Sequence, residues 1–292
     1  MLSIIVSSYK QDYFEQFEKS VQNTVGVPYE IIKVPNKGLM GLCEAYNKGA
    51  QSAKYEYVCF SHEDIIFNTS NWGLNVINHF ESNPTLGLLG VAGASHKTYV
   101  PSGWYPPHMR FIHINLIQED KSGKSETVRH NCENLQTEVA VIDGCFMCTK
   151  KSIWQSVRFD DTLLKGYHCY DLDFSLSVGQ SYKVAVVNDI LLTHLSRGQY
   201  DQKWFVETYK LHKKWKHILP KTTTQITKAE ITQQENTEFC NIVGRSFELK
   251  LGYLAAFKFF LTLKSFKILK YKTLFPPLLK IIYVQLRKKV VQ

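Results

Sequence analysis

Residues 55–64 read YEYVCFSHED, and this stretch decides the fold. Its first six residues are rich in aromatic and β-branched side chains, as in a short buried strand, and four polar residues follow them directly. Two earlier strand-like runs and two stretches of helical spacing complete the pattern: SIIVSS at 3–8, YEIIKV at 29–34, and residues 13–22 and 42–53. Strand, helix, strand, helix and strand in this order imply right-handed crossovers and a parallel sheet.

The ligand of a parallel α/β sheet binds beyond the carboxyl ends of its strands. In this sequence those ends are Ser7-Ser8-Tyr9, Pro35-Asn36-Lys37 and Ser61-His62-Glu63-Asp64. We therefore expect the functional site where these three segments meet.

The remaining chain continues the α/β pattern less regularly. We expect strands at 86–92, 138–148 and 184–188, helices at 71–80, 151–157, 170–181 and 204–217, an excursion over the sheet at 95–133, and a polar linker at 221–237. We accordingly divide the chain into a catalytic domain (1–200), a helical extension with the linker (201–245) and a basic, apolar helical tail (246–292).

The net charge of +9 is concentrated at one end of the 292 residues. Residues 250–292 hold ten Lys and Arg and no acidic residue, whereas residues 1–249 hold 25 basic and 26 acidic residues. A nucleic-acid-binding fold would carry basic charge on its body, so we expect no nucleic-acid partner.

Neither the N-terminus nor the cysteines indicate an extracellular protein. The opening MLSIIVSSYK has a short apolar run without a basic leader, and no uncharged apolar stretch of 18 residues occurs. The seven cysteines are odd in number and scattered, which is typical of reduced, buried thiols. The pair Cys145 and Cys148 forms a C-x-x-C, but it lies in an apolar segment, so we expect no metal or redox role for it.

Three segments could carry chemistry. His62-Glu63-Asp64 offers a hard oxygen ligand beside an imidazole, which suits Mg²⁺ or Mn²⁺, or it is a polar loop. Asp171 and Asp173 open a helix, either as a cap or with one of them as a general base. His194 alone would usually be a structural histidine.

These segments together resemble a family. SIIVSSY, an Asn-bearing turn, GLCEAYNKGA and YEYVCFSHED resemble the nucleotide-sugar-binding half of GT-A glycosyltransferases, most closely the family 2-like enzymes of bacterial surface-glycan assembly. VIDGCFMCTKKSIW, KGYHCYDLDFSL and VNDILLTHLS resemble their acceptor half. The resemblance covers about residues 1–200 and implies a GT-A fold: an α/β, Rossmann-like, mostly parallel central sheet with flanking helices.

The resemblance also implies roles for individual residues. Asp64 matches the last position of the family's Asp-x-Asp metal motif, and His194 matches the histidine that completes the metal site. His62 stands at the motif's first position in place of Asp, and Asp171 matches the general base. Tyr170 replaces the Glu that usually precedes this base. Ser8, Tyr9, Asn36 and His62 are then nucleotide-binding, and Trp104, Asp143, Gly144, His168, Tyr170 and Arg197 are possible donor or acceptor contacts.

The implied activity is a metal-dependent, inverting sugar transfer. A nucleotide-diphosphate sugar, expected to carry UDP, would donate the sugar with Mn²⁺ or Mg²⁺ on the diphosphate. A hydroxyl of a glycan or lipid-linked acceptor would lose its proton to Asp171 as it attacks. The alternatives are an inactive nucleotide- or glycan-binding module of the same fold and a membrane-associated scaffold.

The tail mixes large apolar residues with lysines. Leu254, Phe257, Leu261 and Ile268 would share one face of a helix, and Lys264, Lys267 and Lys270 another. Such a segment can lie in an anionic membrane interface, or it can pack on the body with its lysines solvated. We favour the membrane and expect a cytoplasmic protein, peripheral at the inner face of the cell membrane.

Overall fold

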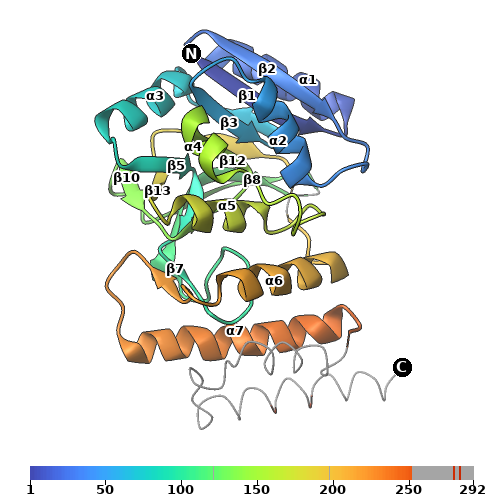
Figure 1. The fold of residues 1–292 in the computed structure, drawn as a ribbon, viewed down its shortest axis with the longest axis vertical. Coiled ribbons are helices and arrows are strands. Elements are labelled where there is room, and N and C mark those ends of the chain that lie inside the picture. Colours follow the sequence, from blue (N-terminus) through green and yellow to red (C-terminus); the bar gives the residue numbers. More distant parts are fainter. Residues whose placement is uncertain (121, 197, 252–278, 280–282, 284–292) are drawn as a thin grey trace.

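The protein was analysed as a computed structural model, which describes residues 1–120, 122–196 and 198–251 together with 279 and 283 (Figure 1). Most of the basic tail predicted at 246–292, including the lysines and apolar residues of its expected two faces, lies outside the described residues. Arg197 lies outside them as well.

The first ninety residues form the alternating strands and helices that the sequence predicts. The elements are β1 (Leu2–Ser8), α1 (Gln11–Thr24), β2 (Tyr29–Pro35), α2 (Leu42–Ser52), β3 (Tyr57–Ser61), β4 (Ile65–Phe67), α3 (Trp72–Ser82) and β5 (Leu86–Gly90). β1 lies between β2 and β3 and runs parallel to both, with Ile5 opposite Ile32 and Phe60. This confirms the parallel sheet expected from residues 3–60.

The second half completes a seven-stranded sheet and adds a smaller one. Its elements are β6 (Ala92–Ala94), β7 (His96–Lys97), η1 (Met109–Phe111), β8 (Ile112–Glu119), β9 (Ser125–His130), β10 (Gln136–Glu138), β11 (Val141–Ile142), β12 (Phe146–Lys150), α4 (Lys151–Val157), α5 (Tyr170–Val178), β13 (Lys183–Val187) and β14 (Leu192–His194). The large sheet has the order β10-β13-β5-β12-β3-β1-β2, in which β12 and β10 run opposite to the other five strands. A mostly parallel α/β sheet is therefore confirmed.

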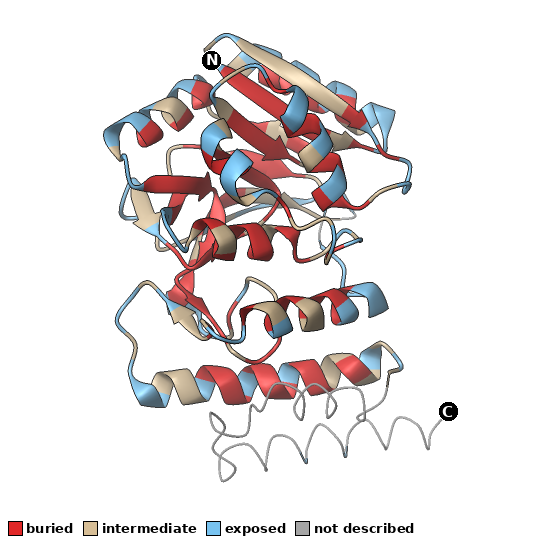
Figure 2. Ribbon diagram, in the orientation of Figure 1, coloured by how far each residue is buried: buried red, intermediate tan, exposed pale blue. Residues whose placement is uncertain are grey.

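The sheet is covered on both faces, and the strand side chains alternate between the two layers. Ile5 belongs to the core formed with α2, α4 and α5, whereas its neighbours Ile4 and Val6 belong to the core formed with α1 and α3. Strands buried on both faces become continuous apolar runs such as SIIV, which is why they stand out in the sequence. Figure 2 shows these central strands as almost entirely buried.

Two segments of the middle region differ from expectation. The predicted excursion at 95–133 contains η1 and the β8–β9 pair, and β8 joins β6 and β14 in the smaller sheet. The predicted strand at 138–148 falls on three short strands: the end of β10, which pairs with β13, then β11, which pairs with β6, and β12, which pairs with both β3 and β5. An apolar run predicts burial but does not show where the chain changes from one sheet to the other.

The predicted polar linker at 221–237 is wrong for most of its length. After α6 (Gln202–Trp215) and β15 (Lys221–Thr222), the chain forms α7 (Lys228–Glu248). A capping box starts this helix: Thr227 accepts a hydrogen bond from the backbone N–H of Glu230, whose side chain bonds back to Thr227. Its buried residues, including Phe239, Ile242 and Val243, form a core with Trp204 and Phe205 of α6 (Figure 2). Burial against α6 therefore outweighs the low helix propensity of its Thr and Asn residues.

Cysteine pairing differs from the expectation of reduced thiols. Cys59 of β3 and Cys148 of β12 face each other in register and form a disulfide, while the other five cysteines are free. Cys145 does not pair with Cys148. Within the described residues, no helix is long and apolar enough to cross a membrane.

Candidate active site

The functional residues predicted from three distant segments meet at the carboxyl end of β3. His62, Asp64 and His194 each point one ligand atom into the same space, and these atoms lie within 4.8 Å of one another. Asp64 Oδ1 is 3.8 Å from His62 Nδ1 and 3.6 Å from His194 Nε2. The side chains of Asp64 and His194 are only 12% and 11% exposed.

Strand pairing brings His194 to this place. The chain leaves Asp64 directly into β4, and β4 pairs antiparallel with β14 so that His194 lies opposite Ile65. Because Ile65 follows Asp64 directly, this pairing brings His194 next to Asp64. The pairing of two three-residue strands joins ligands that are 130 positions apart in the sequence.

These side chains fit a divalent cation. His194 Nε2 is buried and has no hydrogen-bond partner among the described residues, although an orphaned polar atom there costs free energy. Burial lowers the pKa of His194, which keeps its imidazole in the neutral form that binds metals. Burial raises the pKa of Asp64, but the positive charges that His62 and His194 carry at acidic pH, together with hydrogen bonds from Ser196 and the backbone, hold its pKa below the ordinary value. A carboxylate between two imidazoles is a ligand set for a transition ion, and Mn²⁺ suits the mixture better than Mg²⁺ does.

His62 is oriented by Tyr170. Its Nε2 lies 2.6 Å from the Tyr170 hydroxyl, and its Nδ1 is left facing Asp64. Tyr170 itself is 4% exposed and packs edge-on against Tyr46. The structure places the hydroxyl of Tyr170 on a candidate metal ligand, and Tyr170 also lines the 370 Å³ cavity, so its contact with donor or acceptor stays a prediction.

Asp171 lies in the first turn of α5, one residue beyond Tyr170. Its Oδ2 accepts the N–H of Gly144 at 3.1 Å and its Oδ1 that of Leu172 at 2.8 Å, so the carboxylate is held in one orientation. Burial, and next the charge of nearby Asp143, raise the pKa of Asp171 to about 7. Such a carboxylate is matched to accept a proton near neutral pH.

One cavity is lined by two of the three metal-ligand candidates, His62 and His194, and by the candidate base. It has a volume of about 370 Å³, and its lining includes His62, His194, Asp143, Gly144 and Asp171. Gly144 is required because a Cβ there would meet the ring of Tyr170. The structure thus brings together residues that the resemblance assigns to metal binding and to proton transfer.

A second cleft, of about 510 Å³, opens between the ends of β1, β2 and β3. Its lining includes Tyr9, Asn36, His62 and Asp64. Tyr9 is 64% exposed at its rim, whereas Ser8 is buried beneath. Three of the four predicted nucleotide-binding residues, Tyr9, Asn36 and His62, therefore line one cleft, and this cleft shares His62 with the 370 Å³ cavity. Ser8 does not line it.

Glu63 is a site residue to which the sequence assigns no role of its own. Its Oε2 accepts hydrogen bonds from Ser8 Oγ at 2.9 Å and from the N–H of Tyr9 at 3.0 Å, and its Oε1 accepts the N–H of Lys10 at 2.8 Å. Glu63 therefore fixes the turn between β1 and α1. Its position between His62 and Asp64 was the available signal, but nothing local indicates that it faces β1.

Asn36 has a task within its own loop. Its Nδ2 donates to Met40 O and Ser7 Oγ, and its Oδ1 accepts the N–H groups of Leu39 and Met40. All four hydrogen-bonding positions of the amide are occupied, and the side chain is buried. The structure supports Asn36 as the residue that shapes the turn after β2, and a direct contact with a nucleobase stays a prediction.

The remaining candidates lie at the edge of the 370 Å³ cavity. Trp104 and His168 line it. His168 Nε2 lies 3.1 Å from Asp201 Oδ1, and the backbone N–H of His168 donates to buried Glu207 of α6. α6 thereby holds the loop that leads into Tyr170 and Asp171.

Comparison with known proteins identifies the family and the fold. The model of the glycosyltransferase like family matches residues 3–228. No curated protein matches the chain. The crystal structure of S. aureus TarS 1-349 in complex with UDP is similar, with a TM-score of 0.51, 12% sequence identity and coverage of 91% of each chain. The crystal structure of GalNAc-T7 with UDP, GalNAc and Mn²⁺ gives a TM-score of 0.49 and 11% identity over 90% of this chain and 55% of that one.

At these identities the likeness to TarS establishes the fold, which is the GT-A fold that the resemblance implies. The family match covers well over half of the 292 residues. The chain belongs to the glycosyltransferase like family.

Proposed function

We propose that this protein transfers a sugar from a nucleotide-diphosphate donor, expected to be UDP-linked, to a hydroxyl of a glycan or lipid-linked acceptor, with inversion at the anomeric carbon. One observation carries the proposal: His62, His194 and Asp171 line a single cavity that opens next to the cleft at the ends of β1, β2 and β3. Metal-ligand candidates and a carboxylate base of the protein can therefore act on the same bound substrate.

Asp171 is the proposed general base. The acceptor oxygen forms the new bond to the anomeric carbon as the bond from that carbon to the diphosphate oxygen breaks, and Asp171 takes the hydroxyl proton. The hydrogen bonds from Gly144 and Leu172 leave one further acceptor site on each carboxylate oxygen. A single displacement with one base inverts the anomeric configuration.

His62, Asp64 and His194 are the proposed holders of a divalent cation. When bound, Mn²⁺ or Mg²⁺ would neutralise the charge of the diphosphate leaving group as a Lewis acid. Tyr170 keeps His62 turned toward Asp64. Glu63 and Asn36 hold the two turns that form the walls of the donor cleft.

The test is release of UDP from UDP-sugars by the purified full-length protein, measured with Mn²⁺, with Mg²⁺ and with EDTA. We expect turnover with Mn²⁺ that EDTA abolishes and that Asp171→Asn reduces by about 10²–10⁴-fold. Nucleotide binding by calorimetry without turnover of any donor would instead identify an inactive binding module.

We also propose a cytoplasmic location at the inner face of the membrane, supported by the ten basic residues and the absence of acidic ones in 250–292. Each Lys or Arg near an anionic surface contributes about 1 kcal/mol. In liposome flotation with anionic lipid, changing Lys264, Lys267 and Lys270 together to Glu should release the full-length protein. Unchanged flotation would contradict the membrane role of the tail.

A further inference from the structure

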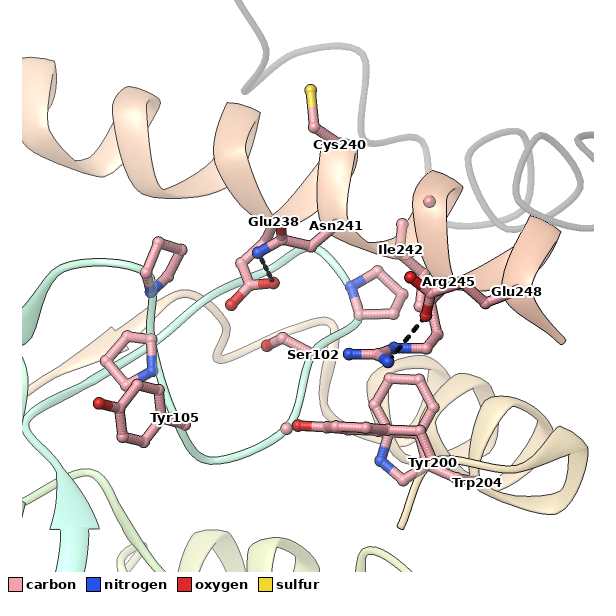
Figure 3. Close-up of a pocket in the computed structure, with 15 residues that line it drawn as sticks. Ser102, Tyr105, Tyr200, Trp204, Glu238, Cys240, Asn241, Ile242, Arg245 and Glu248 are labelled. Carbon is pink, nitrogen blue, oxygen red and sulfur yellow. Dashed lines mark hydrogen bonds and ion pairs between the residues drawn. The ribbon is translucent and has the colours of Figure 1, made fainter. Parts of the chain in front are cut away.

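A separate pocket lies between α7 and the loop at 101–107, and it has a volume of about 670 Å³ (Figure 3). We call it the α7 pocket. Tyr105 stands on one side of it, Tyr200 and Trp204 stand on the other, and Glu238, Asn241 and Arg245 of α7 lie along the helix above them (Figure 3). Most of α7 lies beyond residue 228, where the family match ends.

The α7 pocket adjoins the catalytic cavity. Gly103, Tyr105, Tyr200 and Trp204 line both of them. A ligand whose hydroxyl reaches Asp171 can therefore extend past these residues toward α7. The position corresponds to the acceptor and not to the nucleotide, because the α7 pocket shares no residue with the cleft at the ends of β1, β2 and β3.

The lining has the chemistry that carbohydrate surfaces require. Tyr105 and Tyr200 are each 45% exposed, so their rings can pack against sugar faces. The guanidinium of Arg245 lies 3.9 Å from the centre of the Tyr200 ring and pairs with Glu248 at 2.9 Å. Asn241 donates to Glu238. Planar rings beside fixed amide and carboxylate groups provide both stacking and hydrogen bonds to hydroxyls.

The pocket is built before any ligand arrives. Buried Glu235 of α7 accepts the backbone N–H groups of Tyr99 and Val100 at 2.7 and 2.8 Å, which ties the loop to the helix. Buried Lys97 donates to the carbonyl and the hydroxyl of Ser102. Because both walls are held by buried polar bonds, binding requires little ordering of the protein.

The charged groups favour one kind of ligand. Two carboxylates, Glu238 and Glu248, and one guanidinium, Arg245, line the α7 pocket. Arg245 is the one cationic side chain among the described residues that line the α7 pocket, and it is already paired with Glu248, so an anionic group would find no unpaired positive charge there. A phosphate or an acidic sugar is therefore disfavoured.

We propose that the α7 pocket binds a second, uncharged sugar of the acceptor, so that the acceptor is a neutral oligosaccharide and not a single sugar or a bare lipid-linked hydroxyl. This inference rests on the proposed function, because it assigns a subsite of the same reaction. The sugar that receives the new bond lies at Asp171, and the next sugar along the acceptor lies between Tyr105 and α7.

The experiment uses a panel of defined neutral mono-, di- and tetrasaccharides of glucose, galactose and N-acetylglucosamine with the full-length protein. Binding is measured by saturation-transfer NMR, and transfer by UDP release. We expect oligosaccharides to bind and accept better than the corresponding monosaccharides. Arg245→Ala and, separately, Asn241→Ala should reduce the ratio of kcat/KM for a tetrasaccharide to that for its monosaccharide by about tenfold, as expected for loss of one or two ligand hydrogen bonds.

Arg129→Ala is the matched control, because Arg129 is exposed on β9 and does not line the α7 pocket. Thermal melting would detect whether Arg245→Ala unfolds the protein. In that case Asn241→Ala still tests the inference, because Asn241 is exposed. Equal ratios in wild type and both variants would overturn the inference, as would a preference for acidic oligosaccharides or for peptides. Calorimetry with UDP and Mn²⁺ separates the two proposals: intact nucleotide binding without oligosaccharide binding contradicts only the α7 subsite.

Discussion

The hydroxyl of Tyr170 lies 2.6 Å from Nε2 of His62, across 108 positions of sequence. This contact leaves Nδ1 of His62 facing Asp64, which is the orientation a metal ligand needs. Histidine ligands commonly use their second nitrogen to donate to a fixed acceptor, and that acceptor sets the ring orientation. Tyr170, which stands where the family usually has a Glu, is thus placed to act on the metal site through His62.

Tyr170→Phe removes this hydrogen bond and keeps the buried ring. We expect the affinity for Mn²⁺ to fall by about 10–100-fold, as for loss of other partners of metal ligands. Calorimetric titration of MnCl₂ into the protein with saturating UDP measures it. Tyr182→Phe, at an exposed tyrosine between α5 and β13, is the control; equal Mn²⁺ affinity in the two variants would show that Tyr170 has only a packing role.

Asp171→Asn should separate catalysis from nucleotide binding. The variant cannot accept the acceptor proton, so we expect transfer to fall by about 10²–10⁴-fold. The donor cleft does not include Asp171, so the Kd for UDP should stay within about twofold. Loss of UDP binding in calorimetry would instead make Asp171 a structural residue.

The rate should depend on pH through the same carboxylate. Because the pKa of Asp171 is raised to about 7, its base form is lost as the pH falls below 7. We expect kcat/KM to drop about tenfold per pH unit below that point. A bound cation would lower the pKa of Asp171 and so move this acidic limb of the pH profile to lower pH. The residual activity of Asp171→Asn should lack this limb, and a limb retained in the variant would assign it to another group.

Folding stability should show the opposite dependence. A carboxyl whose pKa is raised in the folded state stabilises the protein fully below its unfolded pKa, near 4, and loses this contribution as the pH rises through about 7. Urea unfolding at pH 4, 5.5 and 7.5 should therefore show wild type becoming less stable relative to Asp171→Asn as the pH increases. A constant difference would mean that Asp171 has an ordinary pKa.

Glu63→Ala should weaken nucleotide binding without removing a ligand contact. The three hydrogen bonds that hold Ser8, Tyr9 and Lys10 would be lost, and the turn beside the donor cleft would loosen. We expect the Kd for UDP to rise by about tenfold, with Glu44→Ala on the exposed side of α2 as control. Equal UDP affinity in the two variants would show that the turn needs no support from Glu63.

The elements best predicted from the sequence are those whose pattern reflects local burial. The strands at 3–8 and 29–34 and the helix at 151–157 agree with β1, β2 and α4 within two residues. The sequence pattern predicts the short strands β10, β11, β12 and β14 poorly, because each contains only two to five residues. α7 was missed because its polar Thr, Gln and Asn residues become helical through contact with α6, which no local pattern reveals.

The sequence by itself determined the alternation of strands and helices, the polar residues at the strand ends and the separation of a near-neutral body from a basic tail. These properties follow from periodicity and composition. Only the tertiary structure decided that His194 meets Asp64, that Tyr170 holds His62, that Glu63 supports the turn after β1 and that α7 forms one wall of the α7 pocket. Each of these depends on contacts between distant segments, and such contacts are set by strand register and packing and not by neighbouring residues.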